Sequence, residues 1–207
     1  KAIAEIAKEN DALLICDEMI TGFGRTGTMF ASPEMEVEPD MMTLGKGVAA
    51  GFPLSLLALR EDIAHAKPYA VPSGSSSSYG GNPLASAAAL ATLQIIQDEK
   101  LAENSARQGE KFLGRLRDFK ERFPFIGEVR GKGLFLAMEL VEDRATKKPM
   151  SADKCLKLFK IGVAEGFLAM SYAPAVRFQP ALSINDEELA RGLELLERTL
   201  TLWQKEL

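Results

Sequence analysis

Residues 12–46 read ALLICDEMITGFGRTGTMFASPEMEVEPDMMTLGK, and this stretch decides the fold. It opens with an apolar run, residues 12–16, that ends on Asp17, and it closes with a second run, residues 41–44, that leads into Lys46. Short apolar runs bounded by polar or turn residues are typical of buried strands in a largely parallel sheet. We therefore predict two such strands, each delivering an ionisable side chain at its carboxyl end.

The carboxyl ends of parallel strands form the edge at which open α/β sheets bind ligands. An aspartate and a lysine at that edge suit pyridoxal phosphate chemistry, because Asp17 can pair with the pyridinium nitrogen and Lys46 can form a Schiff base with the aldehyde. The small residues 47–51 (GVAAG) leave room for a planar ring and would keep the amine away from bulk water, which favours loss of its proton. Lys46 and Asp17 are therefore the predicted catalytic residues.

Three sequence motifs occur in a fixed order along the chain. They are DEMITGFGRTG at residues 17–27, TLGKG with GFPL at residues 43–47 and 51–54, and YGGNPL at residues 79–84. In these motifs the chain closely resembles the class III aminotransferases, and the resemblance extends over essentially its whole length. The family depends on pyridoxal 5'-phosphate, so the resemblance implies that cofactor.

The resemblance also implies a fold, the α/β architecture of fold type I pyridoxal-phosphate-dependent transferases. Residues 1–100 would form part of the cofactor-binding large domain, with a mostly parallel sheet flanked by helices, and residues 101–207 a small carboxyl-terminal α+β domain. Since family members are about twice as long as this chain, we expect it to be the carboxyl-terminal part of a larger protein whose amino-terminal half is missing. Such a fragment would be inactive alone.

Residue roles follow from the same resemblance. Met19 would pack on the face of the cofactor ring, and Ser78 would contact the cofactor phosphate across a homodimer interface. Arg177 matches the family arginine that holds a substrate carboxylate, a task that suits a guanidinium fork. Family members commonly have glutamine where this chain has Ile20, and isoleucine cannot form the hydrogen bond to the ring hydroxyl.

The implied reaction moves an amino group from an amino acid or amine donor to a 2-oxo acid. Lys46 would act as general base and then as general acid, and Asp17 would keep the ring nitrogen protonated. We expect an ω-amino acid donor that resembles 4-aminobutyrate or ornithine. A decarboxylating transaminase or an aminomutase would use the same pair, and a non-catalytic fragment or dimerisation module is the remaining alternative.

A glycine-rich segment, residues 22–27 (GFGRTG), formally matches the dinucleotide-binding pattern. That pattern must open directly into a helix whose amino terminus meets the pyrophosphate, with an acidic residue about 20 positions later. Here Pro33 and Pro39 interrupt the following segment, and Asp40 precedes the next strand. We therefore predict no dinucleotide site.

Composition narrows the possible partners. Apolar residues make up 46% and charged residues 26%, as in ordinary globular proteins. The net charge of -4 provides no positive footprint for nucleic acid or an anionic membrane, and no apolar run approaches the roughly 20 residues of a membrane span. Cys16 and Cys155 form neither a disulfide framework nor a metal-ligand spacing. We expect reduced thiols, no metal and a cytoplasmic location.

The sequence also predicts no catalytic triad of serine, histidine and an acid. His65 is the only histidine, and no nucleophile motif lies near it.

The remaining pattern favours helices at residues 1–10, 83–97, 101–123, 151–165 and 185–205, and strands at residues 54–59, 126–130, 134–141, 168–172 and 175–178. Asn82 with Pro83 predicts a helix start suited to an anion, and Asn185 with Glu188 predicts a capping box.

Overall fold

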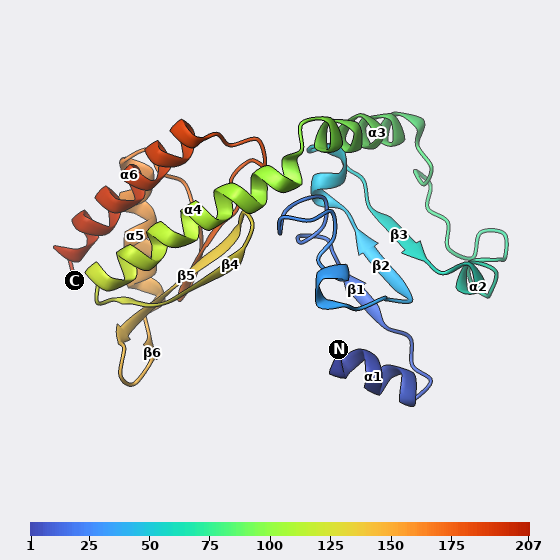
Figure 1. The fold of residues 1–207 in the computed structure, drawn as a ribbon, viewed down its shortest axis with the longest axis horizontal. Coiled ribbons are helices and arrows are strands. Elements are labelled where there is room, and N and C mark those ends of the chain that lie inside the picture. Colours follow the sequence, from blue (N-terminus) through green and yellow to red (C-terminus); the bar gives the residue numbers. More distant parts are fainter. The chain divides into compact units, whose positions relative to one another are not determined.

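The computed structural model describes residues 1–207, apart from the side chain of Tyr172, and is drawn in Figure 1. The chain divides into two compact units, which we call unit 1 (Lys1–Ala102) and unit 2 (Glu103–Leu207). Each unit has its own sheet and its own cluster of buried apolar side chains. The two units are described separately below.

Unit 1 is built around a three-stranded sheet in the order β1-β2-β3, with β1 and β2 parallel and β2 and β3 antiparallel. The predicted strands are confirmed, the first and third with shorter bounds. The elements of unit 1 are α1 (Ala2–Glu9), β1 (Ile15–Asp17), the 3-10 turn η1 (Pro33–Met35), β2 (Met41–Leu44), the 3-10 turn η2 (Lys46–Ala49), β3 (Leu56–Leu59), α2 (Glu61–Ala64) and α3 (Pro83–Asp98).

Two expectations about this sheet are wrong. Only one of its two strand pairs is parallel, because the connection at residues 45–55 is shorter than the dozen or so residues that a parallel crossover needs. The first predicted strand is also not buried, since Leu13 and Ile15 are each 54% exposed. The small core of unit 1 explains this exposure, because it joins β2 to η2, α3 and the glycine-rich loop and includes no residue of β1.

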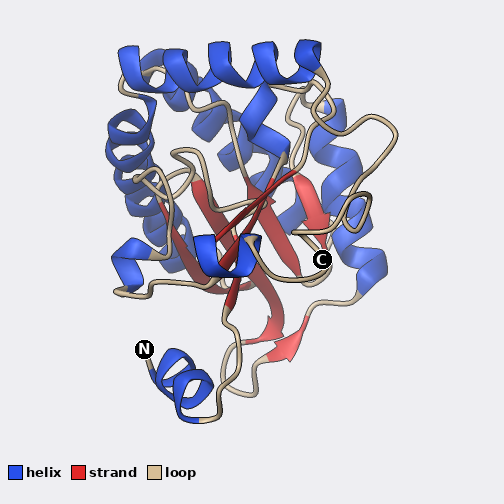
Figure 2. Ribbon diagram, turned by 90° about the vertical axis from the view of Figure 1, so that its right-hand side faces the viewer, coloured by secondary structure: helices blue, strands red, loops and turns tan.

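The amino-terminal helix α1 lies clear of the sheet, at the end of a loop, in both views (Figures 1 and 2). None of its residues is buried, and its apolar side chains Ile3 and Ile6 are 74% and 58% exposed. The helix predicted at residues 1–10 is confirmed, but its apolar stripe has no partner among the residues that the structure describes.

Unit 2 is an antiparallel sheet combined with three long helices. Its main path runs β4-β5-β8-β7, and the two-residue strand β6 pairs with β5. The strands predicted at residues 126–130 and 134–141 are confirmed, and they form an antiparallel pair. The elements are α4 (Leu101–Arg122, which begins in unit 1), β4 (Ile126–Lys132), β5 (Phe135–Asp143), β6 (Lys148–Pro149), α5 (Ala152–Ala164), β7 (Met170–Tyr172), β8 (Ala175–Phe178) and α6 (Asp186–Gln204).

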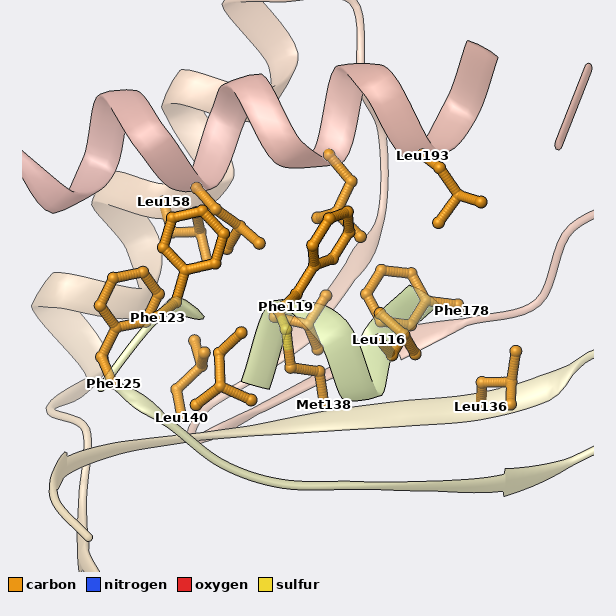
Figure 3. Packing of buried hydrophobic residues seen from close by; sticks show 14 of the residues in the cluster. Leu116, Phe119, Phe123, Phe125, Leu136, Met138, Leu140, Leu158, Phe178 and Leu193 are labelled. Atoms are coloured by element: carbon orange, nitrogen blue, oxygen red, sulfur yellow. The ribbon is translucent and has the colours of Figure 1, made fainter. Parts of the chain in front are cut away.

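The core of unit 2 is large and rich in aromatic side chains. Figure 3 shows side chains of α4, β5 and β8 meeting Leu158 of α5 and Leu193 of α6 in one apolar layer. Phe119 and Trp203 are fully buried, and the Trp203 ring packs edge-on against Phe125 with centroids 4.7 Å apart. The helix predicted at residues 101–123 is confirmed, and its aromatic side chains belong to this core.

Helix α4 approaches the β4-β5 hairpin closely enough to require glycine. A Cβ added to Gly109 would lie 2.1 Å from the backbone oxygen of Gly133, well inside any real contact. Gly114 lies one and a half turns further along α4, and a Cβ added there would meet nothing within 4 Å. Close backbone contact between α4 and the hairpin turn therefore occurs at Gly109 and not at Gly114.

The start of α6 is tied to α4 by one carboxylate. Asp186 Oδ1 accepts hydrogen bonds from Lys111 (2.8 Å), Gln108 (2.6 Å) and Arg107 (2.9 Å). These three donors, Lys111 first, hold the pKa of Asp186 far below its usual range. The predicted capping box is confirmed beside it, with Asn185 and Glu188 each bonding the other's backbone amide.

Candidate functional site

Asp17 ends β1, and the parallel register places it opposite Thr43 of β2. Its Oδ1 atom accepts hydrogen bonds from the Thr43 hydroxyl (2.8 Å) and the Met19 amide (3.1 Å). The Thr43 bond, the Met19 bond and the positive charge of Lys46 lower the pKa of this carboxyl. Asp17 is therefore an ionised carboxylate at neutral pH, with Oδ2 left to accept from a ligand.

Lys46 follows β2 by two residues and begins η2 in the left-handed region, with φ at +47°. A non-glycine residue in that region is uncommon, and such conformations cluster at functional sites. The predicted space around it is present, because a Cβ added to Gly47 or Gly51 would meet nothing within 4 Å. The expectation that the amine is kept from bulk water is wrong, since this open surface leaves Lys46 exposed.

Met19 lies against the turn that carries the lysine. A Cβ added to Gly45 would lie 2.6 Å from Met19 Cε and 2.8 Å from Sδ. Gly45 has an extended φ of 175°, so it is required by this close approach and not by its backbone conformation. Asp17, Met19 and Lys46 thus form one continuous cluster at the end of the parallel strand pair.

Two residues that sequence reasoning missed complete this cluster. Thr43 donates a hydrogen bond from its hydroxyl to Asp17. Aligning the two predicted parallel strands would have identified it, because their register pairs Asp17 with Thr43. Glu18 is only 2% exposed and hydrogen-bonds across the glycine-rich loop. Its signal in the sequence is weak, because the two backbone amides that bond its carboxylate belong to residues 13 and 14 positions later.

The free backbone amides at the start of α3 are engaged by the side chain of its N-cap residue. Asn82 is the predicted N-cap, and its side-chain oxygen accepts from the amides of Leu84 (2.9 Å) and Ala85 (3.2 Å). Pro83 has no N–H, and the Ser86 amide bonds the Asn82 carbonyl. The expectation that backbone amides here would suit an anion is wrong, because these amides already donate to Asn82. Ser78 lies exposed in the loop before the helix.

Arg177 belongs to unit 2, on β8, where it pairs in register with Ala137 of β5 and Met170 of β7. It is half-buried, while its neighbours Val176 and Phe178 point into the core. Arg177 also lines a pocket of about 260 Å³ whose other walls are mainly apolar, including Phe167 and Ile184. A guanidinium at the edge of an apolar pocket suits a carboxylate that carries an apolar or flexible chain.

The features that favoured other functions are accounted for. The glycine-rich loop leads into the short 3-10 turn η1 and not into an α-helix, as the rejection of a dinucleotide site predicts. His65 lies exposed just after α2, with Glu61 3.9 Å away. Among the residues described, no cluster of metal-binding side chains was found, and no helix is long and apolar enough to cross a membrane.

Residues 1–200 match the family model described as aminotransferase class-III. The chain belongs to the class III aminotransferases. This family assignment agrees with the resemblance seen in the three sequence motifs, and it confirms the α/β class of the fold.

Similar proteins within and around this family differ in their named activities. The chain is 39% identical over 97% of its length to an alanine/serine racemase of Pyrococcus horikoshii, and 41% identical over 98% to the mitochondrial ornithine aminotransferase of Arabidopsis thaliana. It covers only 41% and 42% of those two proteins. The chain therefore spans less than half the length of these relatives.

A solved class III structure shows the same fold. An amine transaminase from an uncultivated Pseudomonas species, solved in its PLP-bound form, superimposes with a TM-score of 0.90 at 32% identity. The match covers 97% of this chain and 47% of that protein. The residues of this chain fit the same cofactor, since they supply an ionised carboxylate, a lysine and a small-residue surface between them.

Proposed function

We propose that the whole protein is a pyridoxal-phosphate-dependent aminotransferase that moves an amino group from an ω-amino acid to a 2-oxo acid. The observation that carries this proposal is the pair of side chains at the end of the parallel strands: a carboxylate held in its ionised form beside an exposed lysine. When bound, pyridoxal phosphate supplies an aldehyde that reacts with amines and a ring that accepts electrons from the substrate carbon.

Each residue of the cluster has one task in this proposal. Asp17 would hold the ring nitrogen through Oδ2, while Thr43 and the Met19 amide hold Oδ1 in place. Met19, which lies against Gly45, would pack on the ring. Lys46 would anchor the cofactor through Nζ and would serve as general base and acid. Ile20 offers no hydrogen bond to the ring hydroxyl.

The phosphate and the substrate use residues outside this cluster. Ser78, which is exposed, would hold the phosphate through its hydroxyl, whereas the amides of Leu84 and Ala85 are engaged by the Asn82 cap. In the assembled enzyme this contact comes from the partner subunit of a homodimer, with the cofactor site at the interface. Arg177 binds the substrate carboxylate, and unit 1 and unit 2 correspond to part of the large domain and to the small domain.

The proposed donors are 4-aminobutyrate-like and ornithine-like acids. Both carry the carboxylate that Arg177 requires and a reacting amine at the far end of a flexible chain, which suits the pocket beside Arg177. The similarity to the plant ornithine aminotransferase supports the second of these. We place the enzyme in the cytoplasm and expect neither nucleic acid nor a membrane as its partner.

Amino acid racemisation is a second candidate, favoured by the 39% identity to the alanine/serine racemase. It would use the same lysine and aspartate but would need no 2-oxo acid. Incubation of the purified protein with single-enantiomer alanine, with and without 2-oxoglutarate, separates the two. Loss of chirality without the 2-oxo acid would replace the transaminase proposal by a racemase.

The first experiment is borohydride reduction of the purified full-length protein incubated with pyridoxal phosphate, followed by peptide mass analysis. We expect a pyridoxyl adduct on the peptide that contains Lys46 and none in Lys46→Ala. Lys67→Ala is the matched control, since this lysine is also exposed but lies outside the cluster. A wild-type protein with unmodified Lys46 would remove the basis of the proposal and favour a non-catalytic dimerisation module.

A further inference from the structure

Glu18 is a buried carboxylate between two residues that face the proposed cofactor. Asp17 is the last residue of β1, and Glu18 and Met19 follow it where the chain enters a turn. Glu18 is 2% exposed, whereas Asp17 is exposed and Met19 half-buried. A buried carboxylate is costly unless hydrogen bonds replace its water, so this side chain needs partners inside unit 1.

Those partners come from the two ends of the loop at residues 21–32. Glu18 Oε1 accepts from the Ser32 amide at 2.7 Å. Oε2 accepts from the Ala31 amide at 3.1 Å and from the Thr21 hydroxyl. Burial raises the pKa of Glu18, but the bonds from Thr21, Ala31 and Ser32 outweigh this effect and leave it below its usual range.

The backbone of Glu18 is fixed as well as its side chain. Its amide donates to the Thr43 carbonyl at 3.0 Å, which extends the β1-β2 ladder one residue past Asp17. Its carbonyl accepts from the Gly22 amide at 3.0 Å, and a Cβ added to Gly22 would lie 2.9 Å from that oxygen. Glu18 therefore joins the end of β1 to both ends of the loop at residues 21–32.

We propose that Glu18 is a positioning residue for the cofactor site: by closing the loop at residues 21–32 onto its carboxylate, it fixes the flanking side chains Asp17 and Met19. The inference rests on the proposed function, because those two side chains are the ones assigned to the ring. Glu18 itself points away from the cofactor side and takes no part in proton transfer.

An isosteric change tests this role sharply, because both carboxylate oxygens accept from backbone N–H groups. The amide of Glu18→Gln has only one oxygen, so its NH2 group must face either the Ser32 or the Ala31 amide. A buried N–H left without an acceptor weakens the arrangement by roughly ten-fold or more. Thr21→Val keeps both amide bonds and removes only the hydroxyl, so its effect should be smaller.

The experiment compares wild type, Glu18→Gln, Thr21→Val and the exposed control Glu38→Gln. Three quantities are measured: hydrogen exchange in peptides that cover residues 28–34, the dissociation constant for pyridoxal phosphate, and the absorption maximum of the bound cofactor. We expect faster exchange, about ten-fold weaker cofactor binding and a shifted maximum for Glu18→Gln. Thr21→Val should change all three in the same direction by less, and Glu38→Gln none.

The outcomes separate this inference from the proposed function. If wild type binds the cofactor and both loop variants bind it equally well with an unshifted maximum, Glu18 does not position the site. A wild type without cofactor affinity overturns the proposed function, and the exchange data then decide whether Glu18 closes the loop at all. If Glu18→Gln does not fold, Thr21→Val decides alone.

Discussion

Unit 1 and unit 2 differ most in how completely they bury their apolar side chains. Leu116 and Trp203 of unit 2 are fully buried, whereas Leu13 and Leu84 of unit 1 are 54% and 65% exposed. Yet unit 1 carries the Asp17–Lys46 pair. The comparison teaches that dense packing and the proposed cofactor chemistry are concentrated in different units, so core substitutions in unit 2 should act on stability and substitutions around the pair in unit 1 on the site.

The largest expected effect is on the unit 2 core. Leu116→Ala should lower the free energy of unfolding by about 2–5 kcal/mol, because a fully buried leucine leaves a cavity. The matched unit 1 change, Leu84→Ala, should stay within about 0.5 kcal/mol. Urea denaturation followed by circular dichroism measures both. Equal losses of unfolding free energy in the two variants would contradict the difference in packing between unit 1 and unit 2.

Two glycines of one helix give the next effect. Gly109→Ala should destabilise unit 2 by about 1–3 kcal/mol, because its methyl group would collide with the Gly133 backbone. Gly114→Ala should be neutral or should stabilise the protein by up to about 1 kcal/mol, since alanine favours the helix and has open space there. Thermal unfolding of the two variants checks their opposite signs.

Acid should weaken unit 2 through Asp186. The pKa of Asp186 is lowered in the folded protein, so its stabilising effect is complete above the ordinary aspartate pKa and is lost as the pH falls through the folded value. Asp186→Asn should therefore reduce the urea midpoint at pH 7 and approach wild type in strong acid. A constant difference across the pH range would show that the three donors do not act through the charge.

The smallest effect is expected at Thr43 in unit 1. Thr43→Val removes the hydrogen bond that does most to lower the pKa of Asp17, so this pKa should rise toward its usual range. Asp17 would still be ionised at neutral pH, so activity there should change little while the acid limb of the pH profile moves upward. Carboxyl NMR of Asp17 measures the shift directly. An unchanged or lowered pKa of Asp17 would contradict the role given to the Thr43 hydroxyl.

Features that depend on neighbours in the sequence were predicted well. The strands at residues 41–44 and 175–178 follow from their apolar composition, and the cap at Asn82 and the capping box at Asn185 follow from local hydrogen-bonding rules. Placing Asp17 and Lys46 together required only the rule that parallel strands end at one edge. These predictions need no knowledge of distant contacts.

Features that depend on distant contacts were missed. The exposure of Lys46 depends on which elements cover the sheet, and the orientation of β3 depends on how its connection folds. The role of Glu18 requires residues 13 and 14 positions later to turn back onto it. Neither the periodicity nor the composition of the sequence indicates that the chain folds back in this way, so the sequence analysis assigned Glu18 no role.

Trp203 is the only tryptophan of the chain, and it is fully buried in the core of unit 2. Tryptophan emission is therefore an optical signal of unit 2 alone, since unit 1 contains no such fluorophore. In this chain, the emission maximum therefore reports whether the core around Trp203 stays dry. The fold thus contains its own spectroscopic label for the packing of unit 2.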